Sequence, residues 1–118
     1  MRKIATTVAV VIAATVTFVG LAAAGDIRYR KSVTLSIGQS TVIHGARGNC
    51  GEPAPSWARV KAHLPHIAVA RYSDGDLGTR NSNSCGGPTP ARAVVVTGVK
   101  QGSEKIVLFG DPITITVK

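Results

Sequence analysis

Hydrophobic and polar residues alternate in several short stretches of this chain. Apolar and polar residues alternate strictly in the stretches 33–37 and 113–117, and less regularly in 67–72. Two further stretches, 94–96 and 106–109, are short apolar runs rich in β-branched residues. A period of two is typical of strands with one buried face, and β-branched runs of this length favour strands as well.

Turn-forming residues separate these stretches. Turns are expected at Gly38-Gln39, Asp74-Gly75-Asp76, Gly86-Gly87-Pro88 and Gly110-Asp111-Pro112. Only Trp57–Leu64 fits a short helix; it fits equally a strand, and Pro65 ends it under either interpretation. The pattern therefore predicts six or seven short strands, which favours an all-β sandwich or a small barrel.

The first 24 residues have the parts of a secretory signal peptide. Arg2 and Lys3 precede an apolar run, which ends in Ala22-Ala23-Ala24 before Gly25. The alternative is an uncleaved membrane anchor, since the run approaches the roughly 20 apolar residues that span a bilayer. Four threonines in the run and the small residues at its end favour cleavage before Gly25. We therefore expect residues 25–118 to form one periplasmic or secreted domain, without a stable membrane span after cleavage.

The chain has two cysteines, each in a stretch rich in glycine and proline. Cys50 lies in GNCGEPAPSW and Cys85 in NSNSCGGPTPA. Outside the cytoplasm two such cysteines are expected to pair, which predicts a disulfide joining two loops. Zinc is the alternative, with partners among His44, His63 and His66, but no ligand spacing typical of zinc is present. A catalytic thiol is disfavoured because nothing leaves Cys85 unpaired, and we predict neither a metal nor a cofactor.

No arrangement of residues typical of catalysis is present. The chain lacks a Gly-x-Ser-x-Gly motif, and its closest carboxylates are Asp74 and Asp76. The run Ser-Asp-Gly-Asp is more typical of an Asx turn than of an acid/base pair, and it lacks the later glutamate of a calcium loop. His44 stands in an apolar strand, where a packed or surface histidine is the ordinary case. We therefore predict a protein that is not an enzyme and has no catalytic residues.

The charge of the chain favours acidic partners. It has 14 Lys and Arg against 6 Asp and Glu, and without Arg2 and Lys3 the remainder has a net charge of +6. Outside the cytoplasm this balance favours an anionic envelope component, such as a phosphate-bearing polymer or a lipid surface. Most of the basic residues are scattered, and only Arg28, Arg30 and Lys31 form a cluster. The small number of aromatic residues argues against nucleic acid as a partner.

The two cysteine-bearing loops supply the candidate binding surface. We select Glu52, Trp57 and Arg80, because arginine and tryptophan dominate the energetics of many interfaces. The alternative is that Trp57 is a core residue under the linked loops and that Arg80 is merely solvated. A rigid pair of loops loses less entropy when it binds a partner, which favours a binding surface at this end. The predicted function is therefore binding of a protein or of an anionic envelope component, with a structural role as the other possibility.

Three segments resemble bacterial immunoglobulin-like domains of the group 2 type. VTLSIGQSTVI (33–43) is similar to their first two strands, and PHIAVARYSDGDLG (65–78) to their central segment. The last 26 residues, 93–118, resemble their final strands. The resemblance implies an immunoglobulin-like β-sandwich of about seven strands, here with its disulfide between loops and not through the core.

A second resemblance concerns chagasin-like cysteine-protease inhibitors, which present three loops to a protease cleft. Residues 49–57, NCGEPAPSW, share the asparagine, glycine and tryptophan of the first loop of that family, without its threonines. Gly75–Gly78 would correspond to the middle loop, while Phe109–Pro112 stands where an Arg-Pro-Trp loop is expected. Protease inhibition is therefore the alternative function, and it requires these three segments to gather at one end.

Overall fold

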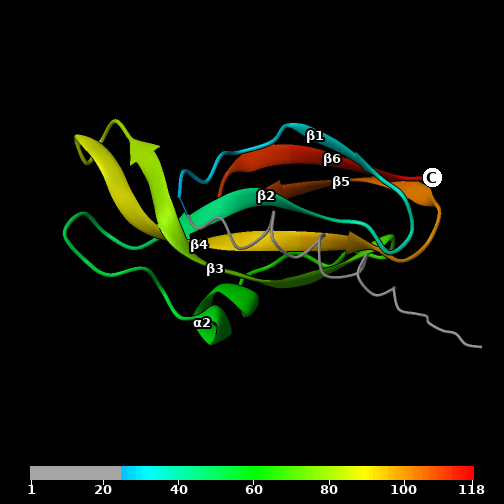
Figure 1. Cartoon of the computed structure of the whole chain (residues 1–118), viewed down its shortest axis with the longest axis horizontal. Coiled ribbons are helices and arrows are strands. Elements are labelled where there is room, and N and C mark those ends of the chain that lie inside the picture. The colour runs from blue at the N-terminus through cyan, green and yellow to red at the C-terminus, as the bar shows by residue number, and fades with distance from the viewer. Residues whose placement is uncertain (1–24) are drawn as a thin grey trace, which may run out of the picture.

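The structure, a computed structural model, describes residues 25–118; the predicted signal peptide lies outside the described residues. The described chain is a β-sandwich of two three-stranded sheets, which confirms the predicted all-β class (Figure 1). One sheet has the order β1–β6–β5 and the other β2–β4–β3. The elements are β1 (Ser32–Leu35), β2 (Ser40–Arg47), α2 (Trp57–Lys61), β3 (Ala70–Ser82), β4 (Gly87–Gly98), β5 (Gly102–Leu108) and β6 (Asp111–Val117).

Strand β1 belongs to the first sheet, and the chain passes from it directly into the second sheet. It pairs in parallel with β6, and the chain then turns at Gly38 and enters the other sheet as β2. The predicted Gly38-Gln39 turn is confirmed: Gly38 has a φ of 87°, and the N–H of Gln39 donates to the carbonyl of Ser36 at 3.0 Å. A backbone in this left-handed region favours glycine, which has no Cβ to clash. The β3–β4 and β5–β6 pairs are antiparallel.

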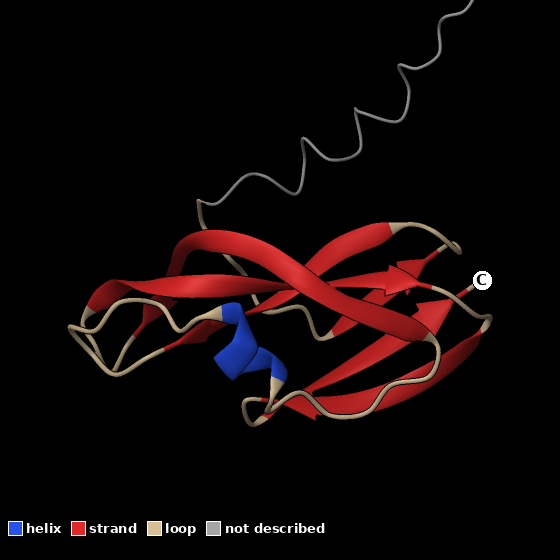
Figure 2. Cartoon of the chain, turned by 90° about the horizontal axis from the view of Figure 1, so that it is seen from below, coloured by secondary structure: helices blue, strands red, loops and turns tan. Residues whose placement is uncertain are grey.

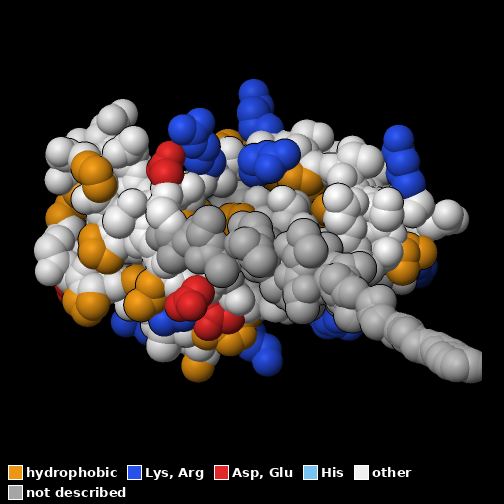
Figure 3. All heavy atoms as spheres, in the orientation of Figure 1, with side chains coloured by type: hydrophobic (Ala, Val, Ile, Leu, Met, Phe, Trp, Pro, Cys, Tyr) orange, Lys and Arg blue, Asp and Glu red, His pale blue; other side chains and the backbone are white. Residues whose placement is uncertain are grey.

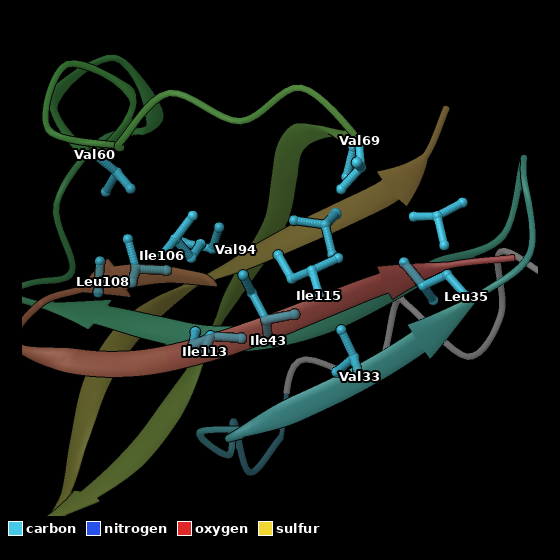
Figure 4. Packing of buried hydrophobic residues seen from close by; sticks show 14 residues of the cluster. Val33, Leu35, Ile43, Val60, Val69, Val94, Ile106, Leu108, Ile113 and Ile115 are labelled. Carbon is cyan, nitrogen blue, oxygen red and sulfur yellow. The ribbon is translucent and has the colours of Figure 1, made fainter. Parts of the chain in front are cut away.

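The core lies between the two sheets (Figure 4). The alternation in 113–117 places Ile113, Ile115 and Val117 inside, where they meet Ile43 and Val94 of the opposite sheet. Fully burying an aliphatic side chain of this size contributes roughly 1.5–3 kcal/mol. The alternation therefore marks core-facing residues in 113–117 and in 33–35, while Ile37 at the end of the second stretch is exposed.

A short helix and the segment after it cover one side of the sandwich (Figure 2). The hydroxyl oxygen of Ser56 caps α2 by accepting from the N–H of Arg59 at 3.3 Å, and Val60 enters the core. The carboxylate of Glu104 on β5 accepts from the backbone N–H groups of Ala68 and Val69, each at 2.7 Å. The helical interpretation of this region is thus confirmed for Trp57–Lys61, and the strand alternative is wrong.

The expected turn at Asp74-Gly75-Asp76 is wrong. These residues form a bulge inside β3, where Asp74 opposes Val94 and Leu77 opposes Arg92, so that the register shifts. The local geometry is nevertheless of the Asx type, because Oδ1 of Asp74 accepts from the N–H of Asp76 at 2.8 Å. Asp76 has a φ of 72°, and a single left-handed residue is sufficient for a bulge as well as for a turn.

The turn expected at Gly86-Gly87-Pro88 lies slightly earlier in the chain. The β3–β4 hairpin turns at 83–86, and Gly87 and Pro88 already belong to β4. Proline in a sheet is tolerated where its missing N–H faces no partner. Strand β2 pairs with β4 only as far as Ala91, so Pro88 and Pro90 lie beyond its end and remove no hydrogen bond to it.

Candidate functional site: a basic cavity at the disulfide-linked end

The two cysteine-bearing loops lie together at the end of the sandwich farthest from the C-terminus (Figure 1). Cys50 and Cys85 form a disulfide with a Cα–Cα distance of 5.3 Å, as predicted. Both thiols of the chain are used in this bond, so neither is left as a metal ligand or a nucleophile. Within residues 25–118, His, Cys, Asp and Glu side chains do not gather in threes close enough to hold a metal ion.

The loop that carries Cys50 has further attachments besides the disulfide. Oε1 of Glu52 accepts from the N–H of Asn49 at 3.1 Å, and the N–H of Glu52 donates to the carbonyl of Asn49 at 3.0 Å. Nε of Arg92 donates to the carbonyl of Pro55 at 2.8 Å, while its Nη1 donates to both carboxylate oxygens of Asp74 at 3.0 and 2.9 Å. Arg92 therefore ties the loop to the sheet, and the loop is ordered before any ligand arrives.

A cavity opens between this loop, the start of α2 and the β5–β6 turn. It has a volume of about 450 Å³, and Arg47, Arg59 and Arg80 line it together with Glu52 and Phe109. A neighbouring hollow of about 280 Å³ shares most of this lining and extends it to Pro53, Pro55 and His63. We call the two together the basic cavity.

The three arginines keep most of their donors available. Nη1 of Arg47 donates to the carbonyl of Gly48 at 2.9 Å, and its Nη2 donates to the hydroxyl of Ser84 at 3.2 Å. Nη1 of Arg80 donates to the carbonyl of Gly45 at 2.9 Å. Among the described residues, none of the three forms an ion pair with a carboxylate. Since each guanidinium has five N–H groups, the cavity retains a net positive charge and several unused donors.

A buried histidine supports the cavity from behind. The bulge between Val42 and His44 turns His44 inward, where it is 1% exposed. Its Nδ1 accepts from the N–H of Gly45 at 2.8 Å, so Nε2 carries the proton and donates to Asp111 at 2.8 Å. Burial lowers the pKa of His44, and the carboxylate of Asp111 offsets this in part. Both ring nitrogens are therefore occupied; the bond to Asp111 holds the start of β6, and the ring of His44 packs against Phe109 with centroids 5.2 Å apart.

The structure brings together only part of the predicted binding set. Glu52 and Arg80 both line the basic cavity, while Trp57, the first residue of α2, is half-buried against the core outside it. Arg28, Arg30 and Lys31 lie in the segment that leads into β1, and Arg28 is paired with Asp26 at 3.0 Å. Figure 3 shows the basic side chains of one face along its borders, with several close together at the upper border and others separate.

Sequence reasoning missed Arg47 and Arg59 as members of the site, and it named Phe109 only as part of a loop in the inhibitor alternative. A signal for the first was present: Arg47 precedes Cys50 by three positions, and Arg80 precedes Cys85 by five. The disulfide joins the two loops, and Arg47 and Arg80 lie on the ends of the strands that lead into them. Arg59 and Phe109 reach the cavity through the placement of α2 and of the β5–β6 turn, which no local pattern indicates.

The three segments required by the inhibitor hypothesis come together only in part. Asn49, Glu52 and Pro53 of the first loop line the basic cavity together with Phe109. Gly75–Gly78, however, belongs to the bulged middle of β3 and forms no loop. The end of the sandwich therefore presents two of the three segments.

Comparison with known proteins adds no relative: no protein-family model, no curated protein and no solved structure matches the chain. Among residues 25–118, no helix has the length and apolar character needed to cross a membrane.

Proposed function

We propose that this is an exported binding protein, periplasmic or secreted, whose disulfide-linked end captures an oxyanion group on a partner. The observation that supports this most is the basic cavity, where Arg47, Arg59 and Arg80 converge against the single carboxylate of Glu52. The disulfide supports export, because such bonds persist mainly outside the cytoplasm. The partner is a protein carboxylate or a phosphate-bearing envelope component.

The chemistry of the cavity suits such a group. A planar guanidinium offers paired donors that match the oxygens of a carboxylate or phosphate. The cavity is concave, which reduces competition from water, and its walls are attached through the disulfide and Arg92. Glu52 offsets only one of the three arginine charges, and its Oε1 is already bonded to the N–H of Asn49. Because the loops are already ordered, little of the binding free energy is lost in ordering them when a ligand binds.

The test is a titration of residues 25–118 with pyrophosphate and with citrate, followed by calorimetry and by the shift in melting temperature. The informative variant is Arg59→Ala, because this exposed side chain makes no hydrogen bond to another described residue and its loss should not disturb the fold. Removing one charge-assisted contact should weaken binding roughly tenfold or more.

Arg30→Ala is the matched control. It removes the same charge from an exposed position outside the cavity, and binding should change by less than about twofold. Absence of binding of either anion to the wild type at millimolar concentration would contradict the proposal. An equal loss in Arg30→Ala and Arg59→Ala would contradict it too, because binding would then reflect general surface charge.

Protease inhibition is a second candidate, favoured by the basic cavity that Asn49, Glu52 and Pro53 share with Phe109. The immunoglobulin-like family likeness likewise stays a proposal, with which two packed three-stranded sheets agree. A papain-like cysteine protease assayed with micromolar protein distinguishes the two functions. Inhibition that survives Arg59→Ala but is lost when Phe109 is replaced by alanine would favour the inhibitor over the anion-binding protein.

A further inference from the structure

The two sides of α2 face different cavities. Arg59 and His63, four positions apart, line the basic cavity, while Trp57, Lys61 and Leu64 line a separate groove of about 470 Å³. We call the second one the flank groove; it is completed by Pro65, His66, Ile67, Ala70, Arg71 and Tyr72. Residues three and four apart share one face of a helix, so this division follows from the helical spacing.

The flank groove has an apolar floor and a basic rim. Trp57, Leu64, Ile67 and Tyr72 are half-buried and pack against the core from outside. Lys61, His66 and Arg71 are exposed at its border, and none of the residues that line the groove is acidic. The groove therefore suits an occupant with apolar side chains next to carboxylates.

One wall of the groove is the free edge of a sheet. Strand β3 lies at the end of the order β2–β4–β3, and it contributes Ala70, Arg71 and Tyr72 to the lining. The chain already uses the far part of this edge, where the N–H of Ile27 donates to the carbonyl of Thr79 at 2.7 Å. The part beside the groove pairs with no described residue, so it is open to another strand.

The direction of the backbone groups follows from the pairing. The N–H and carbonyl of Gly98 both bond to the β2 side, to Gln39 and Gly38. Successive residues of a strand point these groups to opposite sides, so those of Thr97 point toward its partner Arg71 on β3. The N–H and carbonyl of Tyr72 consequently point away from β4, toward the free edge. An edge of this kind is a template for an added strand.

We propose that an extended peptide segment of a partner protein, with apolar residues alternating with acidic ones, adds to this edge of β3. Its apolar side chains enter the flank groove beside Trp57 and Tyr72, and its backbone bonds to the outward groups of Tyr72. Alternate side chains point away from the floor of the groove, where the carboxylates meet Arg71 at its border. This site is separate from the basic cavity and does not depend on its function.

The probe is the synthetic peptide acetyl-EVEVEVE-amide, titrated into residues 25–118. Trp57 is the only tryptophan of the chain and lies in the groove, so its fluorescence reports occupancy directly. The expected result is a saturable blue shift, with acetyl-KVKVKVK-amide binding at least fivefold more weakly because its charges face Arg71. Equal binding of the two peptides, or no shift at millimolar peptide, would overturn the proposal.

Two N-methylated peptides test the backbone bonds. One has its valine nitrogens methylated and the other its glutamate nitrogens, so that each blocks one edge of the added strand. Strand addition requires that one of them lose binding while the other keeps it. If both bind as well as the parent peptide, the groove takes side chains without a strand, and the proposal fails.

Charge reversal completes the experiment. Arg71→Glu should reverse the preference between the acidic and basic peptides, and this exposed side chain makes no hydrogen bond that the fold needs among the described residues. Arg30→Glu, outside the groove, should leave the preference unchanged. A shift of Trp57 fluorescence with phosphatidylglycerol vesicles but with neither peptide would overturn the proposal in favour of a lipid surface.

Discussion

Removal of the disulfide by a Cys50→Ser/Cys85→Ser double substitution should lower the stability of the domain without changing its fold. The two cysteines are 35 positions apart, so their bond closes a loop of about 36 residues in the unfolded chain. The chain-entropy relation then gives a loss of about 4 kcal/mol at 25 °C. A domain of this size is stable by about 5–15 kcal/mol, so the loss is large but not sufficient to unfold it.

The native contacts of the loop argue that the fold survives. Arg92 still holds Pro55, and Glu52 still bonds to Asn49, whether or not the sulfur atoms are joined. The substitution therefore acts mainly by raising the conformational entropy of the unfolded state, which becomes more expanded. Urea unfolding should show a lower free energy of unfolding together with a larger m-value, since more surface is exposed on unfolding.

The wild type unfolded in the presence of a reductant provides an independent check, because it lacks the bond but keeps both cysteines. It should match the double variant within about 1 kcal/mol. A loss below about 1 kcal/mol in both would refute the reasoning from loop closure. A near-native stability combined with a disordered 48–56 loop, seen by amide exchange, would show that Arg92 and Glu52 do not hold the loop.

Three further predictions concern single residues of the fold. Burial lowers the pKa of His44 below its ordinary 6.5, so as the pH falls the unfolded chain binds a proton at this histidine before the folded protein does. The melting temperature should therefore drop from pH 7 toward pH 5, and His44→Gln should make that dependence weaker. Glu104→Ala leaves two backbone N–H groups without their acceptor and should cost about 1–3 kcal/mol in urea unfolding, of which Glu104→Gln recovers part. Gly75→Ala would place a Cβ 2.7 Å from that of Ala93 and should cost about 1–3 kcal/mol, whereas Gly25→Ala, with nothing within 4 Å, should be neutral; equal melting temperatures for the two would contradict the steric argument.

Strands could be predicted from the sequence where one face of the strand is buried and the other is exposed to solvent. Residues 113–117 alternate because Ile113 and Ile115 face the core while Thr114 and Thr116 do not. The disulfide was predictable because the chain has only two cysteines. The bulge at Asp74–Asp76 was not predictable, because Asp-Gly-Asp has the same local preferences in a bulge as in a turn, and only pairing with β4 decides between them.

The candidate site was harder to predict from the sequence than the fold. Glu52 and Arg80 could be selected because they lie close to the cysteines in sequence. Trp57 was selected for the same reason, but it occupies the opposite side of α2 from Arg59, and so belongs to a different surface. Which side of a five-residue helix faces which cavity is decided by Val60, the residue that enters the core, and one apolar residue in such a short segment gives no clear periodicity.

Helix α2 is consequently the element on which both proposed surfaces depend. Its position is determined by the Ser56 cap, by Val60 in the core and by the contact of Arg92 with Pro55 just before it. A five-residue helix is not stable alone, so these tertiary contacts hold it. A shift of α2 toward the basic cavity would therefore open the flank groove, and a shift away would close it. Any change that loosens Arg92 should for that reason affect anion binding and peptide binding together, whereas Arg59 and Arg71 should each affect only their own surface.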